Sequence, residues 1–457
     1  MLDSRTRDAV VSVRNAAEAE GIHATLTVHH EKSHLMRIGN NSVSLNTLED
    51  LTRLDILVTN GRRQATHTHM GTIEGPGTVR KALDTAVEKS KVATPKTYDP
   101  IPDRVEETIE ESSQFDPALA DLDPGLKADA YREIIRRLGQ GYNFSGAWSS
   151  GLTELFVVTT GSPHTLFHQG TDQLFSVVLK HPEKKWELNH TQTGWHASDF
   201  RVETTVEALG RLLPVYEKHD GFRVEPGDYT VLFGADAVSE IVGTAVWTGL
   251  FGRSWEEKQS WTAQQNVGDR VLGGNITLTD DPADPLTFMF GFDGTGRRRK
   301  RFPLIEKGIL SGLMYDASTA ARYGKPPTGH DTNSPSLVLA TGSGPACPME
   351  AAKNLGRVLY IPALHYMNIP SRSKGIFTGS SRFNAVLVED GEVVSPIFSS
   401  RITDSFGNVL SNVKVLSSEA ESVNGSNTYG RRSPVAMSVP SYIISGGVKI
   451  TDCAESF

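Results

Sequence analysis

The chain contains few cysteines and no long hydrophobic run, and each absence excludes a class of protein. Its 457 residues include only Cys347 and Cys453, which lie far apart in the sequence. A disulfide framework needs more cysteines than this, so we expect a reducing compartment. No apolar stretch approaches the roughly 18 residues of a membrane-spanning helix. Residues 1–5, MLDSR, lack the apolar stretch of a secretory signal peptide. We therefore expect a cytoplasmic protein without a membrane segment.

An excess of positive charge is also missing. The formal net charge is −8, whereas a protein that binds duplex nucleic acid presents clustered lysine and arginine. Nucleic acid is therefore not an expected partner. The one dense basic run is RRRKR at residues 297–301. It has two interpretations, a solvated turn between two strands or a docking patch for an acidic partner, and the first is the simpler.

The hydrophobic pattern predicts an α+β protein with two domains that meet near residue 225. In the N-terminal domain, residues 1–225, the pattern predicts an antiparallel sheet flanked by helices, followed by a long surface connection over residues 94–125. Helices are predicted at 4–20, 77–93, 126–138 and 198–213, the last ending before Pro214. Strands are predicted at 22–30, 34–38, 42–46, 51–59, 64–70, 144–148, 152–160 and 164–180.

The C-terminal domain, residues 226–457, has a different character. A strand at 229–233 leads into one clear helix at 235–250, and short strands with glycine-rich turns follow. This pattern predicts a β-rich, half-barrel-like domain with few helices. Within it, residues 301–312, RFPLIEKGILSG, predict two strands with a turn at Lys307 and Gly308, and residues 315–324 predict a short helix.

The amino-acid sequence of this C-terminal part resembles the TldD/PmbA family. In that family an Asp-x-x-Gly segment, here within GFDGTG at 291–296, precedes such a strand pair and a short helix. Residues 378–392, TGSSRFNAVLVEDGE, are similar to the form seen in a TldE-like branch. In the N-terminal half, RIGNN at 37–41, NGRR at 60–63 and YDPIP at 98–102 also fit. The resemblance spans nearly the whole chain and is strongest after residue 225.

The resemblance implies a zinc peptidase family from whose metal site this chain departs. Catalytic members carry His-Glu-x-x-x-His on a helix and a cysteine in Cys-Gly-Lys near the C-terminus. Here Ser239 and Thr244 stand at the two histidine positions, and Glu240 keeps the general-base position. Tyr429 stands where the cysteine would be. Hydroxyl groups are poor zinc donors. We therefore expect no metal or other cofactor on this chain, with zinc in a TldD-like partner, and the simplest interpretation of the helix is packing.

Residues that could line a substrate groove lie in the part of the C-terminal sequence that most resembles the family. They are His365, Tyr366, Thr378, Arg382 and Asn384. The planar fork of Arg382 could hold a peptide carboxylate or backbone carbonyls. Alternatively, Arg382 pairs with Glu389 or a neighbouring carboxylate and only stabilises the fold. The pair His67 and His69 shares one face of a predicted strand, which is weak evidence for a metal site.

These observations favour a TldE-like, non-catalytic subunit that helps to bind and thread unfolded or modified peptides for a TldD-like catalytic chain. The expected assembly is a heterodimer with that chain or a homodimer. Two alternatives stay open. The chain could be a peptidase on its own, with an atypical metal site that uses Glu240, or a non-proteolytic regulator, since the family's historical label involves modulation of DNA gyrase. Whether the chain is an enzyme is thus undecided by its sequence.

Overall fold

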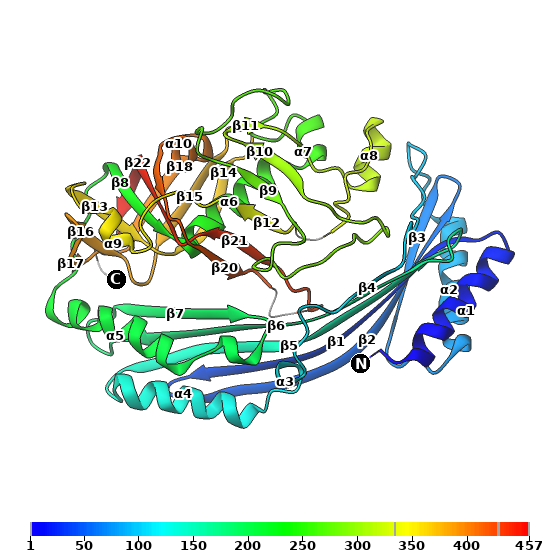
Figure 1. Ribbon diagram of the computed structural model, residues 1–457, viewed down its shortest axis with the longest axis horizontal. Coiled ribbons are helices and arrows are strands. Elements are labelled where there is room, and N and C mark those ends of the chain that lie inside the picture. The colour runs from blue at the N-terminus through cyan, green and yellow to red at the C-terminus, as the bar shows by residue number, and fades with distance from the viewer. Residues whose placement is uncertain (1, 333–334, 427–429, 456–457) are drawn as a thin grey trace.

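The computed structural model describes residues 2–332, 335–426 and 430–455, and the chain folds as an α+β protein, as predicted. A long, curved sheet from the N-terminal part lies along one side of the molecule (Figure 1). The β-rich C-terminal part lies over one face of this sheet, and helices cover its other face and its end. The space between the two parts is where the candidate site lies.

The N-terminal part contains a seven-stranded sheet in the order β3-β2-β1-β5-β6-β4, with β7 also paired to β6. All its pairings are antiparallel except that of β4 with β6. Its strands are β1 His23–Gly39, β2 Ser42–Asn60, β3 Arg63–Met70, β4 Ile109–Glu111, β5 Asn143–Thr159, β6 Thr165–Lys180 and β7 Glu187–Gly194. Its helices are α1 Ser4–Ala19, α2 Pro76–Val92, α3 Pro117–Ala120, α4 Pro124–Leu138, η1 Ala197–Asp199 and α5 Val202–Lys218.

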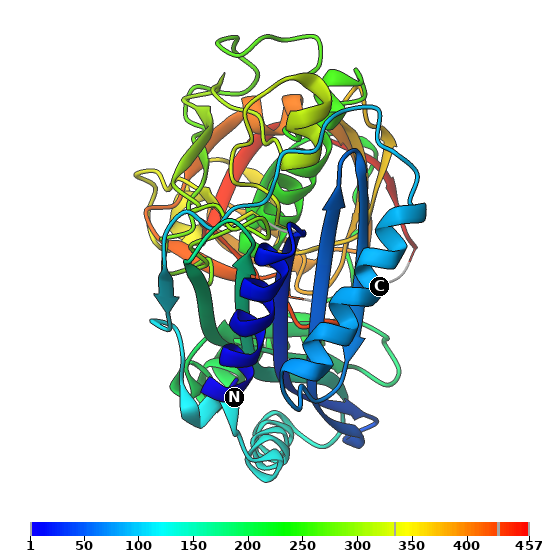
Figure 2. The ribbon, with the colours of Figure 1, turned by 90° about the vertical axis from the view of Figure 1, so that its right-hand side faces the viewer.

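Helices α1 and α2 pack side by side against the strands at one end of the sheet (Figure 2). The apolar stripes that the sequence predicts are the buried faces: Val10, Val13 and Ala17 on α1, and Val79, Leu83 and Ala86 on α2. Asp3 caps α1 by accepting a hydrogen bond from the backbone N–H of Thr6 at 2.8 Å. Helices α4 and α5 contact each other near the other end.

The strands of this sheet are longer than the sequence pattern predicts. The predicted strands at 22–30 and 34–38 are one continuous strand, β1, and the same holds for the predicted pairs that form β2 and β5. The prediction was wrong because charged and polar residues interrupt the apolar pattern. In the structure Glu31 is fully buried and accepts a hydrogen bond from Arg53 on β2 at 2.8 Å. Such a buried pair lets the strand continue through a polar position.

Two further expectations for the N-terminal part need correction. The segment 94–125 is not only a surface connection, because it contains β4 and α3 and buries Val105 and Gln114. Gln114 accepts a hydrogen bond from the backbone N–H of Met289 at 2.7 Å, so this segment joins the two parts of the chain. Pro214 does not end its helix: α5 starts at Val202 and runs through the proline to Lys218.

The C-terminal part contains a six-stranded sheet, β11-β10-β9-β12-β21-β20, and a nine-stranded sheet, β14-β15-β18-β22-β8-β13-β16-β17 with β19 also on β22. Its strands are β8 Gly227–Gly234, β9 Leu278–Asp280, β10 Phe302–Glu306, β11 Ile309–Leu310, β12 Leu337–Leu339, β13 Arg357–Ile361, β14 Leu364–Ser371, β15 Ile376–Ser381, β16 Val386–Glu389, β17 Glu392–Pro396, β18 Ser400–Ser405, β19 Val413–Leu416, β20 Ala420–Asn424, β21 Ala436–Pro440 and β22 Tyr442–Cys453. Its helices are α6 Ala235–Gly249, α7 Gly252–Glu256, α8 Ala317–Tyr323, α9 Pro348–Ala351 and α10 Phe406–Ser411.

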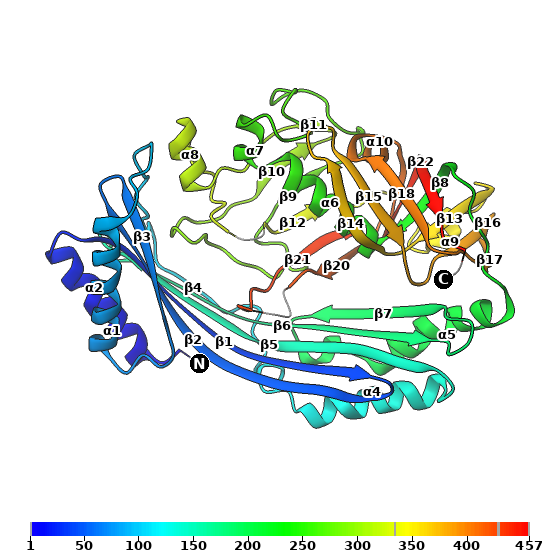
Figure 3. The ribbon, with the colours of Figure 1, turned by 180° about the vertical axis from the view of Figure 1, so that it is seen from behind.

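Helix α6 is the central helix of the C-terminal part. It contacts β20 and β21 of the six-stranded sheet and β8, β14 and β22 of the nine-stranded sheet. Figure 3 shows the nine-stranded sheet from behind, with β7 of the N-terminal sheet running beneath it. The predicted strand pair around Lys307 and the short helix after it are present as β10, β11 and α8.

One hydrophobic cluster joins the two parts. It combines Trp148 and Phe175 of the N-terminal sheet with Leu232, Val386 and Ile444 of the nine-stranded sheet. We keep residue 225, in the connection between α5 and β8, as the proposed domain boundary. Of the helices in the described part of the chain, none has both the length and the apolarity that a bilayer crossing needs.

Candidate functional site

Helix α6 carries the positions that the family resemblance singles out. Its apolar stripe is buried, as the spacing predicts: Val238, Ile241, Val242, Ala245 and Val246. Ser239, Glu240 and Thr244 all line one cavity of about 610 Å³, which we call the α6 cavity. Its other walls include Ser176 and Asn189 from the N-terminal sheet. The fold therefore brings the three predicted positions to one cavity between the two parts of the chain. Tyr429 lies outside the described residues.

The wall of the α6 cavity is acidic. Burial raises the pKa of Asp236 to about 6. Desolvation by the surrounding residues also raises the pKa of Glu240, although Glu240 is exposed. Glu421 is not a lining residue, but its charge interacts with Asp236; desolvation, followed by the negative charges of Asp236 and Glu419, raises its pKa to about 7. These carboxyl groups therefore hold protons more readily than ordinary ones, and a further anion is disfavoured here.

The donor set of the α6 cavity does not match a zinc site. None of the described residues that line it is a histidine or a cysteine. The Ser239 hydroxyl donates to the backbone oxygen of Asp236 at 2.8 Å, so it is engaged within its own helix. Nowhere in the described ranges do three or more His, Cys, Asp and Glu side chains group as a metal ion would need. Zinc requires imidazole, thiolate or carboxylate donors, and here only Glu240 of the three family positions supplies one.

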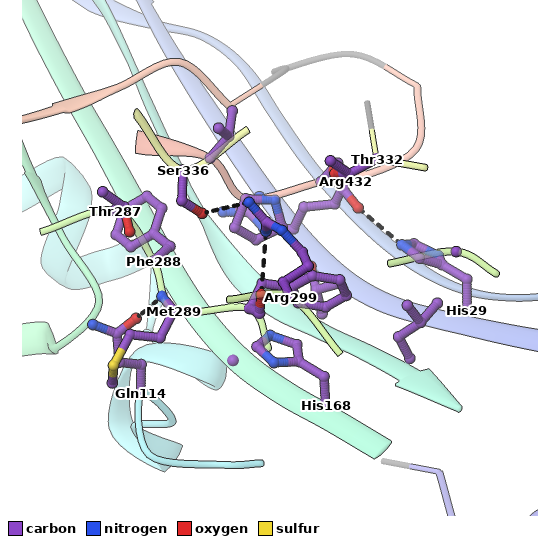
Figure 4. A pocket seen from close by; sticks show the side chains of 18 of the residues that line it. His29, Gln114, His168, Thr287, Phe288, Met289, Arg299, Thr332, Ser336 and Arg432 are labelled. Atoms are coloured by element: carbon purple, nitrogen blue, oxygen red, sulfur yellow. Dashed lines mark hydrogen bonds between the residues drawn. The ribbon is translucent and has the colours of Figure 1, made fainter. Parts of the chain in front are cut away.

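A second cavity, of about 220 Å³, lies between the N-terminal sheet and the C-terminal part; we call it the interface cavity. It adjoins the α6 cavity, because Val435 lines both. Figure 4 shows Arg299 directed toward Ser336, and His29 bonded to the backbone of Arg432. The His29 Nε2 donates to the Arg432 oxygen at 2.8 Å. Burial lowers the pKa of His29 to about 4, and its Nδ1 lies 3.6 Å from the Glu31 carboxylate.

Arg299 changes the interpretation of the basic run. The predicted solvated turn is wrong for this residue, since its side chain is 2% exposed. Its Nη2 donates to both carboxylate oxygens of Asp280, at 2.7 and 3.0 Å, and its Nη1 donates to the backbone oxygen of Phe290 at 3.1 Å. The neighbouring Arg298 is half-exposed and pairs with Glu107. The run is therefore partly structural.

Arg432 anchors the segment that precedes β21 to the N-terminal sheet. Its side chain is 3% exposed, and its Nε donates to the Asp172 carboxylate at 2.7 Å. Its Nη1 donates to the Ser149 hydroxyl at 3.1 Å, and its backbone N–H donates to Glu31 at 2.8 Å. Sequence reasoning missed these residues. The only signal was a set of acidic residues inside predicted strands, which does not identify their partner.

A third cavity, of about 410 Å³, brings together three of the five groove candidates, His365, Tyr366 and Arg382. We call it the arginine pocket. Arg382 does not pair with Glu389, because Glu389 binds Arg357. Arg382 instead pairs with Glu187 of the N-terminal part at 3.0 Å. The expectation of a neighbouring carboxylate is thus met, by a residue from the other half of the chain.

The other two groove candidates lie outside this pocket. The Asn384 side chain binds the backbone of Asn189, accepting from its N–H at 3.0 Å and donating to its oxygen at 2.6 Å. Thr378, on β15, shares a hydrogen bond with Thr403 at 3.0 Å and accepts one from Arg401. The five candidates therefore do not form a single groove wall.

The histidine pair on β3 behaves as two ordinary strand residues. His67 contacts the Lys89 ammonium through Nδ1 at 3.3 Å, and His69 contacts the backbone oxygen of Thr72 at 3.4 Å. Desolvation, followed by the charges of Lys89 and His69, lowers the pKa of His67. The ammonium group of Lys89 beside His67 makes this pair a poor site for a metal cation.

The PmbA/TldA metallopeptidase C-terminal domain matches residues 226–452. A protein named metalloprotease from Methanothermobacter thermautotrophicus is 24% identical over 164 residues, 32% of this chain and 33% of that one. The chain spans 16% and 33% of the length of the first curated relatives that it matches.

Solved structures share the fold over almost the entire chain. TldE from Thermococcus kodakarensis superimposes with a TM-score of 0.82 at 17% identity, covering 97% of this chain and 100% of that one. A Thermotoga maritima protein, described as a proposed modulator of a DNA gyrase, gives a TM-score of 0.78 at 14% identity over 97% and 99% of the two chains. At these identities the likeness establishes the fold.

Proposed function

This chain belongs to the PmbA/TldD metallopeptidase family, and from that premise we propose that it is a non-catalytic, TldE-like subunit. In this proposal it binds extended, unfolded or modified peptides in the cytoplasm and presents them to the zinc of a TldD-like partner. It forms a heterodimer with that partner, and a homodimer is the alternative assembly.

The observation that carries the proposal is the donor set on α6. The zinc peptidases that the sequence resembles need two imidazoles and a thiolate, and the α6 cavity here presents the hydroxyls of Ser239 and Thr244 beside Glu240. A general base acts on a water molecule whose pKa a metal lowers to about 7. Without metal ligands around it, Glu240 has no such water to activate. This donor set therefore supports binding rather than hydrolysis on this chain.

The shape of the space between the two parts supports a peptide as the ligand. The interface cavity, the α6 cavity and the arginine pocket follow one another, because Val435 lines the first two and Phe383 lines the last two. Their volumes of about 220, 610 and 410 Å³ fall in or near the range of ligand sites. Trp247 of α6 lines the α6 cavity, and its exposed aromatic side chain offers apolar contact area there.

The test is a cleavage assay on an unfolded protein substrate with the purified chain, with a TldD-like chain, and with both. We expect no hydrolysis by this chain alone and faster hydrolysis by the mixture than by the partner alone. Glu240→Gln should not abolish hydrolysis by the mixture, since Glu240 performs no chemistry. Hydrolysis by this chain alone that disappears in Glu240→Gln would favour a peptidase with an atypical metal site. Copurification without any change in cleavage would favour a regulatory protein.

A metal titration tests the same proposal independently. We expect the wild-type chain to take up no stoichiometric zinc. The combined substitutions Ser239→His, Thr244→His and Tyr429→Cys restore the family's ligand types, so we expect zinc uptake by this variant if it folds. Metal content after gel filtration measures both. Tight zinc in the wild-type chain would contradict the proposal, and a folded variant without zinc would show that these positions do not converge.

A further inference from the structure

The residues that line the arginine pocket carry a net positive charge, whereas the charged residues that line the α6 cavity are acidic. The charged lining residues of the arginine pocket are Lys180, Lys185 and Arg382 against a single carboxylate, Glu187, which makes three positive charges and one negative, or +2. Burial opposes ionisation of Glu187, but its hydrogen bonds to Lys180 and Arg382 outweigh burial and lower its pKa. His365 adds no charge, because desolvation and the nearby Arg382 lower its pKa.

The Arg382 guanidinium is held in place and keeps free donors. Its Nε and Nη2 donate to Glu187 at 3.3 and 3.0 Å, and its Nη1 donates to His365 Nε2 at 2.9 Å. The guanidinium has five N–H groups, so these three bonds leave two. Its carbon lies 4.8 Å from the centroid of the Phe383 ring. A donor group that neighbours fix beforehand loses little freedom when an anion binds.

The backbone around this pocket is strained at several non-glycine residues. Lys185, Tyr366 and Phe383, which all line the pocket, have φ angles of 67°, 51° and 56°, and Asn384 follows with 53°. Left-handed backbone at such residues persists only where surrounding contacts hold it, and it gathers at ligand sites. Here the two hydrogen bonds between the Asn384 amide and the backbone of Asn189 supply such a contact.

The charge of the neighbouring cavity decides which part of a peptide this pocket takes. Phe383 lines both the arginine pocket and the α6 cavity, and the wall of the α6 cavity carries the carboxyl groups of Asp236 and Glu240. An anionic chain end is disfavoured beside these carboxyl groups and favoured beside Arg382, where fixed donors and excess positive charge face it. An extended peptide in the α6 cavity has one obligatory anionic end, its C-terminal carboxylate.

We propose that the arginine pocket binds the free C-terminal carboxylate of an extended peptide whose preceding residues lie in the α6 cavity. This inference rests on the proposed function, because it takes an extended peptide as the ligand. The carboxylate accepts hydrogen bonds from the two remaining Arg382 N–H groups, and the Lys185 ammonium contributes charge at the rim. The chain thereby selects peptide ends over internal segments and sets the direction in which a peptide lies across α6.

The experiment compares two forms of one unstructured peptide, with a free C-terminus and with a C-terminal amide. Both carry a neutral fluorophore at the N-terminus, and fluorescence anisotropy measures their affinity for the full-length chain at low ionic strength. A charge-assisted hydrogen-bond pair predicts binding of the amide at least about tenfold weaker than binding of the acid. Arg382→Gln should abolish this difference by weakening the acid form only. Arg357→Gln is the matched control, because Arg357 also pairs with a glutamate but lines none of the three cavities.

Lys185→Ala guards against a folding defect in the Arg382 variant. Lys185 is exposed, and its ammonium contacts the backbone oxygen of Pro182, so its removal leaves the Glu187 ion pairs intact. It should weaken the acid form several-fold and leave the amide unchanged. Equal binding of acid and amide by the wild-type chain would overturn the carboxylate pocket and leave peptide binding standing. Binding of neither form would overturn the proposed function itself.

Discussion

Removing the charge of Asp172 should destabilise the protein strongly, because Asp172 neutralises the buried Arg432. Both side chains are nearly inaccessible, at 1% and 3% exposure, and the Arg432 Nε lies 2.7 Å from the carboxylate. Removing one partner of a buried ion pair costs about 3–5 kcal/mol, since the remaining charge is left uncompensated. We therefore expect Asp172→Asn and Arg432→Met each to lower the free energy of unfolding by about 3 kcal/mol or more. The double variant should lose clearly less than the sum.

Urea unfolding followed by tryptophan fluorescence measures these changes, since Trp148 is buried on β5 beside Ser149, a partner of Arg432. Arg431→Met is the matched control. Arg431 is the next residue and also forms an ion pair, with Asp55 at 2.7 Å, but its side chain is 40% exposed. An exposed pair contributes at most about 1 kcal/mol. Equal losses for the Arg431 and Arg432 variants, or additive single losses in the double variant, would refute the reasoning. Hydrogen exchange at residues 430–436 should rise in the Arg432 variant only.

Two further predictions concern a buried amine and a close strand contact. Burial, with a smaller effect of the Arg432 charge, lowers the pKa of Lys127 to about 7. Between that value and the unfolded value of about 10.4, the unfolded chain binds more protons, so stability rises with pH by about 1.4 kcal/mol per unit. Lys127→Met should remove this slope between pH 7.5 and 9.5 in thermal unfolding scans, and an unchanged slope would contradict the assignment. Gly151 on β5 has no room for a Cβ, which would lie 2.2 Å from the backbone oxygen of Lys32 on β1. Gly151→Ala should therefore cost about 1–3 kcal/mol, whereas Gly77→Ala, where a Cβ meets nothing within 4 Å, should be neutral or slightly stabilising.

The helices were easier to predict than the strands for a physical reason. Helices α1, α2 and α6 lie with one stripe on a core, so their apolar residues recur at helical spacing and the stripes are the buried faces. Strand β1 instead has one face toward α1 and the other toward a buried polar layer that contains His29 and Glu31. Its middle therefore carries charge, which in a sequence is indistinguishable from a loop.

The amino-acid sequence by itself determined the α+β class, the family and the chemical types at positions 239, 240 and 244, because these depend on local periodicity and on residue identity. Only the tertiary structure decided which polar groups meet. Arg382 and Glu187 are 195 residues apart, and Arg432 and Asp172 are 260 apart. A charged residue can pair with any of many opposite charges along a chain, and burial, which selects the partner, is a property of the packed molecule.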